Sequence, residues 1–290
     1  MTIWNLGSVN ADRVYRLPHL PQPGETLSST EYSEGLGGKG ANMSVAIARA
    51  GGRVEHIGAV GSDGVWMRER LASAGVGVDH LSVAQQPSGH AIIAVDAQGE
   101  NQIIVYSGAN RVISVAHALT ALDGAEPGDI AICQNETNGQ EAFLSAARSR
   151  DLTVAYAAAP FELAAVQAVI NDLDLLILNA VEAAQLEAAL QTPIDRLPVG
   201  HIVITLGEKG CRWIDTVKGE IQEFPAPKVE PVDTTGAGDT FTGYLLAALD
   251  AGDSMEDAIA LALKAGALMV TRPGTAEVIP ARVEVDSVFP

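Results

Sequence analysis

The chain has 290 residues, of which 47% are hydrophobic, so it can bury the core of one large domain or of two small ones. Its 36 acidic residues outnumber its 18 basic residues, which gives a net charge of −18. This balance argues against nucleic acid or an anionic membrane surface as a partner, because both require a positive protein surface.

Residues 2–7 are the first predicted strand. The turn residues Gly7 and Ser8 follow it, and the polar residues Asn10 and Asp12 come next. Polar groups directly after a strand lie where α/β sheets bind ligands. Asp12 is also typical of a turn, so this segment alone leaves both interpretations open.

Residues 13–34 contain three prolines and the turn sequence Pro-Gly-Glu-Thr, which excludes a crossover helix and favours strands at an edge. Residues 91–95 and 102–106 form a predicted hairpin, because residues 96–101 contain glycine and other turn formers. Together the two segments predict a small sheet that caps a binding site. We expect one domain over 1–290 with this lid, about 12–35 and 89–107, inserted into it.

The next feature is a glycine-rich motif, residues 35–42, which opens a predicted helix that ends at Gly51. It matches the dinucleotide fingerprint Gly-x-Gly-x-x-Gly, with Glu55 twenty residues after the first glycine. That fingerprint should directly follow the first strand, whereas roughly thirty residues intervene here, and Glu55 lies near the start of a strand. A phosphate-binding Walker A loop is excluded because Gly40 follows Lys39 in place of Ser or Thr.

The remaining sequence alternates strands and helices. Residues 54–61 are a second core strand, and short apolar runs follow at 129–134, 152–156, 174–178 and 201–206. Near-continuous apolar strands predict a parallel sheet that is covered on both faces. Three of these runs lead into polar residues, at 134–136, 179–182 and 205–208, and we expect these groups to share one rim of the sheet.

The motif at 233–240, Asp-Thr-Thr-Gly-Ala-Gly-Asp-Thr, leads into the apolar helical run 241–249. The first amides of a helix lack intrahelical acceptors and attract a phosphoryl group, and small residues leave these amides uncovered. A carboxylate beside such an anion site, here Asp239, is suited to take a proton from an attacking hydroxyl. The same pattern also occurs in an ordinary glycine turn with a capping Asp or Thr.

This motif resembles the C-terminal signature of the ribokinase-like (PfkB) carbohydrate kinases, Asp-Thr-x-Gly-Ala-Gly-Asp. The resemblance extends from Gly7 to Gly274. It implies an α/β fold, the ribokinase-like three-layer sandwich, with a mainly parallel central sheet and a small β-sheet lid. It also implies a homodimer that forms through the lid.

The resemblance assigns roles residue by residue. The sugar would contact Asn10, Asp12, Gly38, Lys39, Asn42, Glu136 and Asp239. Asp239 would be the catalytic base, beside an anion hole made by Gly236, Ala237 and Gly238. The nucleotide would contact Asn179, Thr205, Gly207, Gly210 and Gly238. Taken alone, Glu136 is also typical of a solvated loop carboxylate, and Thr205 to Gly210 are a weak signal.

Two ions are implied as well. Glu182 would act on Mg²⁺ through water, which is reasonable because magnesium keeps several of its waters. A monovalent cation, K⁺, would lie at Asp233, Thr235, Thr271 and Gly274. Helix capping by Asn179 and turn capping by Asp233 are the plain structural alternatives. The sequence departs from the family at 156–160, Tyr-Ala-Ala-Ala-Pro, where close relatives carry Asn-Pro-Ala-Pro.

The expected function is an ATP-dependent sugar kinase that phosphorylates a primary hydroxyl, with D-ribose as the expected substrate. Another sugar, such as fructose or 2-keto-3-deoxygluconate, or a nucleoside is the alternative on the same scaffold. A non-catalytic sugar or nucleotide sensor is the rival class, but pure binding has no need of a base such as Asp239. A nucleoside base needs aromatic or apolar surface, and aromatic residues make up only 4% of the chain.

The cysteines and the N-terminal residues indicate the cellular compartment in which we expect the protein. Cys133 and Cys211 lie in apolar, strand-like segments without the spacing of a metal site. The N-terminal residues lack a signal-peptide pattern, and no run of about 20 apolar residues occurs. We expect a reduced, cytoplasmic protein without disulfides.

Overall fold

A large twisted sheet forms the centre of the computed structural model, which describes residues 1–290. Its strand order is β13-β12-β11-β10-β9-β8-β1-β4-β5. All neighbours from β11 to β5 are parallel, whereas β12 and β13 are antiparallel additions at one edge. The strands are β1 (Thr2–Leu6), β4 (Arg53–Gly61), β5 (Leu81–Ala84), β8 (Ile130–Gln134), β9 (Thr153–Ala157), β10 (Leu175–Asn179), β11 (His201–Thr205), β12 (Cys211–Asp215) and β13 (Glu220–Phe224).

Nine α-helices cover the two faces of this sheet. Apolar side chains of α1, α2, α7, α8 and α9 pack in one core cluster, and those of α3, α4, α5 and α6 pack in a second. The helices are α1 (Lys39–Arg49), α2 (Val65–Ser73), α3 (Val115–Ala121), α4 (Gln140–Arg148), α5 (Leu163–Val169), α6 (Ala180–Leu190), α7 (Ala237–Ala251), α8 (Met255–Met269) and α9 (Arg282–Val288). The expected three-layer α/β sandwich is confirmed.

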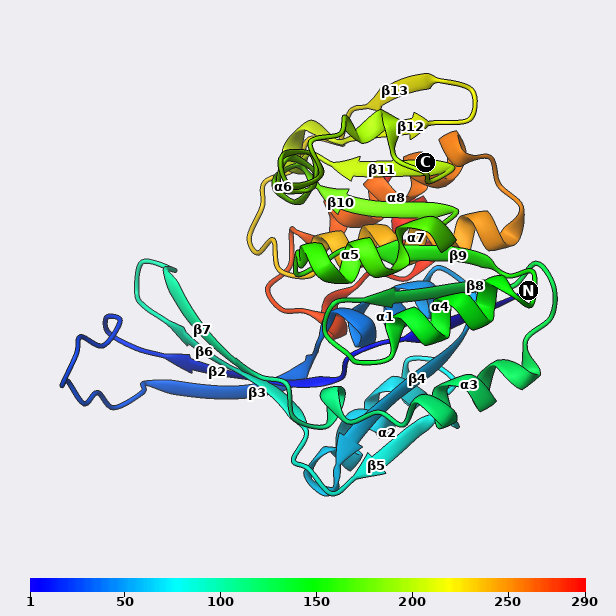
Figure 1. Ribbon diagram of the computed structural model, residues 1–290. Coiled ribbons are helices and arrows are strands. Elements are labelled where there is room, and N and C mark those ends of the chain that lie inside the picture. The colour runs from blue at the N-terminus through cyan, green and yellow to red at the C-terminus, as the bar shows by residue number, and fades with distance from the viewer.

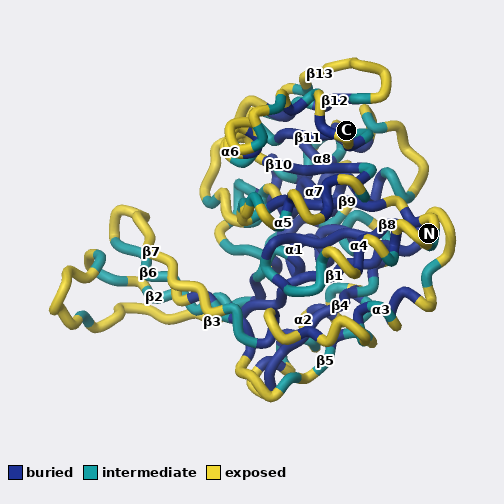
Figure 2. The backbone as a smooth tube through the Cα atoms, in the orientation of Figure 1, coloured by how far each residue is buried: buried dark blue, intermediate teal, exposed yellow.

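A second, small sheet projects from this body (Figure 1). Its order is β3-β2-β6-β7, with strands β2 (Asn10–Arg16), β3 (Glu31–Gly37), β6 (Gly89–Val95) and β7 (Asn101–Tyr106). The pairing of Asn10 with Gly37 extends the first hairpin by two residues at each end beyond the expected 12–35, because the backbone ladder continues down to the body. Figure 2 shows that the outer part of this sheet is mostly exposed, in contrast to the buried body.

The connection between the two sheets positions the site. Only three residues separate β1 from β2, so the carboxyl end of β1 leads directly into the small sheet (Figure 1). The carboxyl ends of the other parallel strands lie on the same side, because parallel strands share one direction. The polar residues that follow these strands therefore lie at the rim that faces the small sheet. No helix in the chain is long and apolar enough to cross a membrane.

Candidate active site

Helix α7 begins at the glycine turn of the 233–240 motif. Gly236 precedes the helix with φ at 76°, in the left-handed region that other residues disfavour. A Cβ atom at Gly238 would meet nothing within 4 Å, so the first turn of the helix opens into free space. The amides of Gly236 and Gly238 are therefore accessible to an anion, whereas the Ala237 amide donates to the Thr234 carbonyl at 3.3 Å.

Asp239 lies in that first turn, and it is only 8% exposed. Its Oδ2 accepts a hydrogen bond from Asn42 Nδ2 of helix α1, at 2.8 Å. Burial raises the pKa of Asp239 to about 6, although Lys39 and the Asn42 bond lower it. The carboxylate is thus ionised at neutral pH and more basic than an ordinary Asp, which suits a general base.

Close packing of α1 against α7 brings Asn42 to Asp239. A Cβ atom at Gly243 of α7 would lie 2.4 Å from the Cβ of Ala46 and 2.7 Å from the carbonyl oxygen of Met43. Only glycine permits this approach. Our sequence analysis did not identify Gly243 as part of the site, although a glycine inside an apolar helix is a signal of close packing.

Glu136 follows β8, and it ties two other segments of the rim together. Its Oε2 accepts from the Lys39 amide at 3.0 Å and from the Ser8 hydroxyl, which follows β1. The carboxylate of Asp239 raises the pKa of the Lys39 side chain, which is therefore firmly cationic at the centre of the site. The sequence predicts Ser8 only as a turn residue, whereas the structure places it against Glu136.

Asn10 begins strand β2 and is 6% exposed. Its Oδ1 accepts from Asn110 Nδ2 at 2.7 Å, and Asn110 Oδ1 accepts in turn from the Val9 amide at 2.9 Å. Asn110 thereby sets the orientation of the Asn10 amide. Asn110 lies in the 3₁₀ turn Gly108–Arg111 after β7. It is not predictable as a site residue, because nothing in the local sequence distinguishes it from any loop asparagine.

Asp12 lies where the small sheet meets the body. Burial, together with the nearby carboxylates of Glu136, Glu277 and Asp239, raises the pKa of Asp12 to about 7. The Thr275 hydroxyl lies 3.5 Å from its Oδ2. Four carboxylates thus converge on one region, and this arrangement favours a ligand that offers hydroxyl donors.

Asn42 has a second feature that points to a ligand. The residue is 4% exposed, and its Oδ1 atom is buried without a hydrogen-bond partner in the protein. An unpartnered buried acceptor costs free energy, so such atoms in native sites usually meet a water or a ligand. A ligand hydroxyl beside Asp239 would satisfy this oxygen.

Asn179 and Glu182 form a capping box at the start of α6. The Asn179 Oδ1 accepts from the amides of Val181 and Glu182, both at 2.9 Å, and Glu182 Oε2 accepts from the Asn179 amide at 2.8 Å. Asn179 therefore caps helix α6, which is the structural role that the sequence left open for it. Burial raises the pKa of Glu182, while the Asn179 amide and Lys39 lower it.

Thr205, Gly207 and Gly210 lie at the tight turn between β11 and β12. The Thr205 hydroxyl donates to the Leu178 carbonyl at 3.4 Å, and the Leu206 amide donates to the Gly210 carbonyl at 2.8 Å. The first contact joins β11 to β10, and the second closes the turn on itself. They place the turn at the same rim as Asn179, because Asn179 and Thr205 are partners in the parallel ladder.

Asp233 joins the glycine turn to the loop after α8. Its Oδ1 accepts from the Thr235 amide at 2.9 Å, and its Oδ2 accepts from the Gly274 amide at 3.1 Å. The Thr271 hydroxyl donates to the Leu268 carbonyl at 2.7 Å within the same loop. No group of three or more His, Cys, Asp or Glu side chains with metal-binding geometry occurs in the chain.

Comparisons with known proteins agree with this geometry. Residues 3–282 match the family described as pfkB family carbohydrate kinase. A ribokinase from Haemophilus influenzae is 34% identical, with 98% of this chain and 96% of that protein covered. Among solved structures, a ribokinase from Cryptococcus neoformans in complex with ADP is 36% identical with a TM-score of 0.85, covering 99% of both chains.

An Arabidopsis thaliana ribokinase complexed with ribose and ATP has a TM-score of 0.84 at 26% identity, covering 99% of this chain and 97% of that one. These likenesses span the whole chain, and the family match includes the rim, the small sheet and the α7 turn. The chain therefore belongs to the pfkB family of carbohydrate kinases.

Proposed function

We propose that this kinase transfers the γ-phosphoryl group of ATP to the primary hydroxyl of D-ribose, giving ribose 5-phosphate and ADP. The observation that carries the proposal is the buried pair of Asp239 and Asn42 at the N-terminal end of α7. Asp239 is an ionised base there, and Asn42 presents a free acceptor oxygen beside it. A protein that only binds a sugar has no need of such a base.

Asp239 acts on the acceptor hydroxyl. As the hydroxyl oxygen forms its bond to the γ-phosphorus, its proton passes to an Asp239 oxygen, and the bond from phosphorus to the ADP oxygen breaks. The amides of Gly236 and Gly238 would donate to the charged phosphoryl oxygens during this transfer, and the Ala237 amide would join them by leaving the Thr234 carbonyl. Lys39, held near Asp239 and Glu136, adds positive charge in a site that is otherwise acidic.

The two ions fit the residues present. Glu182 engages one oxygen in capping α6, so its other oxygen is available to a magnesium-bound water. Asp233, Thr235, Thr271 and Gly274 offer one carboxylate and a loop of backbone carbonyls, the oxygen donors that a monovalent cation prefers. When bound, Mg²⁺ would neutralise charge on the phosphates, and K⁺ would stabilise the loop beside the anion hole.

The polar groups favour a free sugar over a nucleoside. The side chains proposed to hold the sugar with Asp239 are carboxylates, amides and one ammonium group: Asn10, Asp12, Lys39, Asn42 and Glu136. A nucleoside lacks the anomeric hydroxyl and would leave some of these buried groups unpaired. Each such group costs roughly 1 to 3 kcal/mol, which corresponds to rejection by about tenfold or more.

A coupled assay for ADP release tests the proposal directly. D-ribose, fructose, 2-keto-3-deoxygluconate and adenosine are compared at saturating MgATP, and we expect D-ribose to give the highest kcat/KM. Asp239→Asn protein is the control for contaminating kinases. If adenosine gives the highest kcat/KM the pentose assignment fails, and if no compound releases ADP while ribose binds, the sensor class is correct.

We also propose a homodimer through the small sheet. That sheet projects from the body, yet its side chains include several exposed apolar residues: Tyr32, Ile92, Ile103, Ile104, Val105 and Tyr106. Tyr32, Ile92, Ile104 and Tyr106 lie on one face of the sheet, and Ile103 and Val105 lie on the other. Exposed apolar side chains on a projecting sheet are typical of an interface. Closed over the sugar, the same sheet would act as a lid that keeps water from ATP. Since ATP is the phosphoryl donor, we place the enzyme in the cytoplasm.

A further inference from the structure

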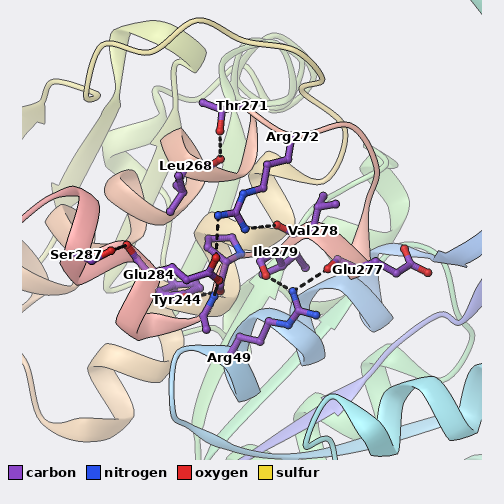
Figure 3. A network of polar contacts seen from close by, with 12 residues as sticks. Arg49, Tyr244, Leu268, Thr271, Arg272, Glu277, Val278, Ile279, Glu284 and Ser287 are labelled. Atoms are coloured by element: carbon purple, nitrogen blue, oxygen red, sulfur yellow. Dashed lines mark hydrogen bonds and ion pairs between the residues drawn. The ribbon is translucent and has the colours of Figure 1, made fainter.

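The loop after α8 is held in place by hydrogen bonds from helices α1 and α7. It contains the 3₁₀ turn Ala276–Val278, and Arg49 of α1 donates to the carbonyls of Glu277, at 3.0 Å, and Ile279. The Tyr244 hydroxyl of α7 donates to the Pro280 carbonyl at 2.6 Å. Figure 3 shows these contacts and the Glu277 side chain, which extends away from them. Its carboxylate therefore projects from a fixed backbone.

Two side chains of this loop bind the edge of the small sheet. Glu277 Oε1 accepts from the Leu36 amide at 3.0 Å, and the Thr275 hydroxyl donates to the Leu36 carbonyl at 2.9 Å. Leu36 lies on β3, the edge strand, whose outward backbone groups have no neighbouring strand. The two side chains thus take the place of a partner strand at the root of the sheet.

The same contacts adjoin Asp12. A Cβ atom at Gly37 would lie 2.1 Å from Asp12 Oδ2, and one at Gly35 would lie 3.4 Å from the Glu277 oxygens. These are the first two glycines of the motif that matched the dinucleotide fingerprint. The absent side chain of Gly37 makes room for the Asp12 carboxylate, whereas a Cβ atom at Gly35 would only reach ordinary contact with Glu277. The Asp12 contact accounts for Gly37 without any dinucleotide.

We propose that Glu277 and Thr275 are positioning residues for the acceptor sugar, because they clasp Leu36 at the root of the small sheet and thereby fix Asp12 over the site. Neither residue touches the reacting atoms. The adjacent Gly274 amide donates to Asp233 at 3.1 Å, so the same loop also joins the sheet to the α7 turn. The kinetic part of this inference rests on the proposed sugar kinase activity.

The test compares Glu277→Ala with Glu277→Gln, whose side-chain oxygen can still accept from the Leu36 amide. Thr275→Ala and Thr275→Ser form the equivalent pair for the hydroxyl. Glu34→Ala is the matched control, because Glu34 lies on the same strand but bonds to Arg13 of β2 and not to the loop after α8. Two quantities are measured: hydrogen exchange of residues 31–37 in the free enzyme, and the KM for ribose and kcat at saturating MgATP.

We expect faster exchange of residues 31–37 in Glu277→Ala. The KM for ribose should rise about tenfold, which is the typical effect of one lost hydrogen bond to a charged group. The kcat should stay within about threefold of wild type. Glu277→Gln and Thr275→Ser should restore the KM, and Glu34→Ala should match wild type.

Unchanged exchange in Glu277→Ala would overturn the clasp. Faster exchange with an unchanged KM would overturn the positioning of Asp12, and so would a Glu277→Gln variant as impaired as Glu277→Ala. Exchange needs no substrate, so a wild-type enzyme that is inactive on ribose would refute the proposed function and leave the clasp tested independently.

Discussion

The rim of the large sheet and the small sheet lie on opposite sides of the same site, but they are built in opposite ways. At the rim, Asn42 and Asp239 are both more than nine-tenths buried, and they bond to each other across α1 and α7. In the small sheet, all six residues of β7 are exposed. Asp12 lies between the two regions, on a strand that begins in the body and ends in solvent.

This difference separates two physical requirements. Proton transfer needs fixed geometry, which a packed core supplies, whereas substrate entry needs an element that can open at low cost. Segments with few buried contacts open most easily. Variants at the rim should therefore change kcat, and variants in the small sheet should change the KM for the sugar.

The largest effect is expected from Asp239→Asn. Loss of the base should lower kcat by at least about a hundredfold, while the affinity for ribose changes much less. The Asn side chain can still accept from Asn42, so the geometry of the rim is kept. Steady-state kinetics and ribose titration measure the two quantities. Near-normal turnover would remove Asp239 from the mechanism.

The pH dependence of kcat/KM should report the ionisation of two carboxyl groups of the free enzyme, Asp12 and Asp239. Burial raises the pKa of Asp12 to about 7 and that of Asp239 to about 6, and both must be ionised to act. We expect kcat/KM to fall below about pH 7, and by about tenfold per pH unit for each protonated group. Asp12→Asn should leave a single step near pH 6. A flat profile from pH 5 to 8 would contradict both assignments.

Charged substitutions in β7 test the role of the small sheet in assembly. Ile104 and Val105 point to opposite faces of the sheet, so Ile104→Asp and Val105→Asp probe the two faces separately. The variant on the interface face should become monomeric and raise the KM for ribose about fivefold to tenfold, with kcat less affected, as a cost of roughly 1 kcal/mol predicts. Light scattering gives the mass. A monomeric wild type would reject the dimer.

Replacing Na⁺ by K⁺ should raise activity several-fold, roughly the effect of 1 kcal/mol on a rate, because the cation loop shares its backbone with the α7 turn. Asp233→Asn should reduce this response. The comparison is made at constant ionic strength and saturating Mg²⁺. Equal activity in both salts would argue that Asp233 only caps the turn.

The last effect concerns stability rather than activity. The folded pKa of Asp239, about 6, lies above its ordinary 3.8, so protonation stabilises the fold. That stability is fully present below about pH 4 and is lost as the pH rises through about 6. Asp239→Asn should therefore raise Tm by a few degrees at pH 8, from roughly 2 to 3 kcal/mol, but not at pH 4. Calorimetry at both pH values checks it, and an equal shift at both would argue against a strained carboxylate.

The sequence by itself determined the parallel sheet, the helix that follows the 233–240 motif and the lid hairpins. Apolar runs, glycines and turn formers act within about ten residues, and such local patterns depend little on the rest of the chain. The family and the kinase activity followed from the same short motif. The sequence placed Cys211 in a strand-like segment, but it did not predict β13 or the antiparallel pairing of β12 with β11, because the pattern of these strands does not distinguish a sheet edge from a hairpin beside it.

Only the tertiary structure decided which polar groups meet. Asn42 and Asp239 are 197 residues apart in the chain, and Leu36 and Glu277 are 241 apart. Their contacts depend on how closely α1 packs against α7 and on where the last loop turns back to the body. The raised pKa values of Asp12 and Asp239 have the same origin, since burial and neighbouring charges arise from packing and have no local sequence signal.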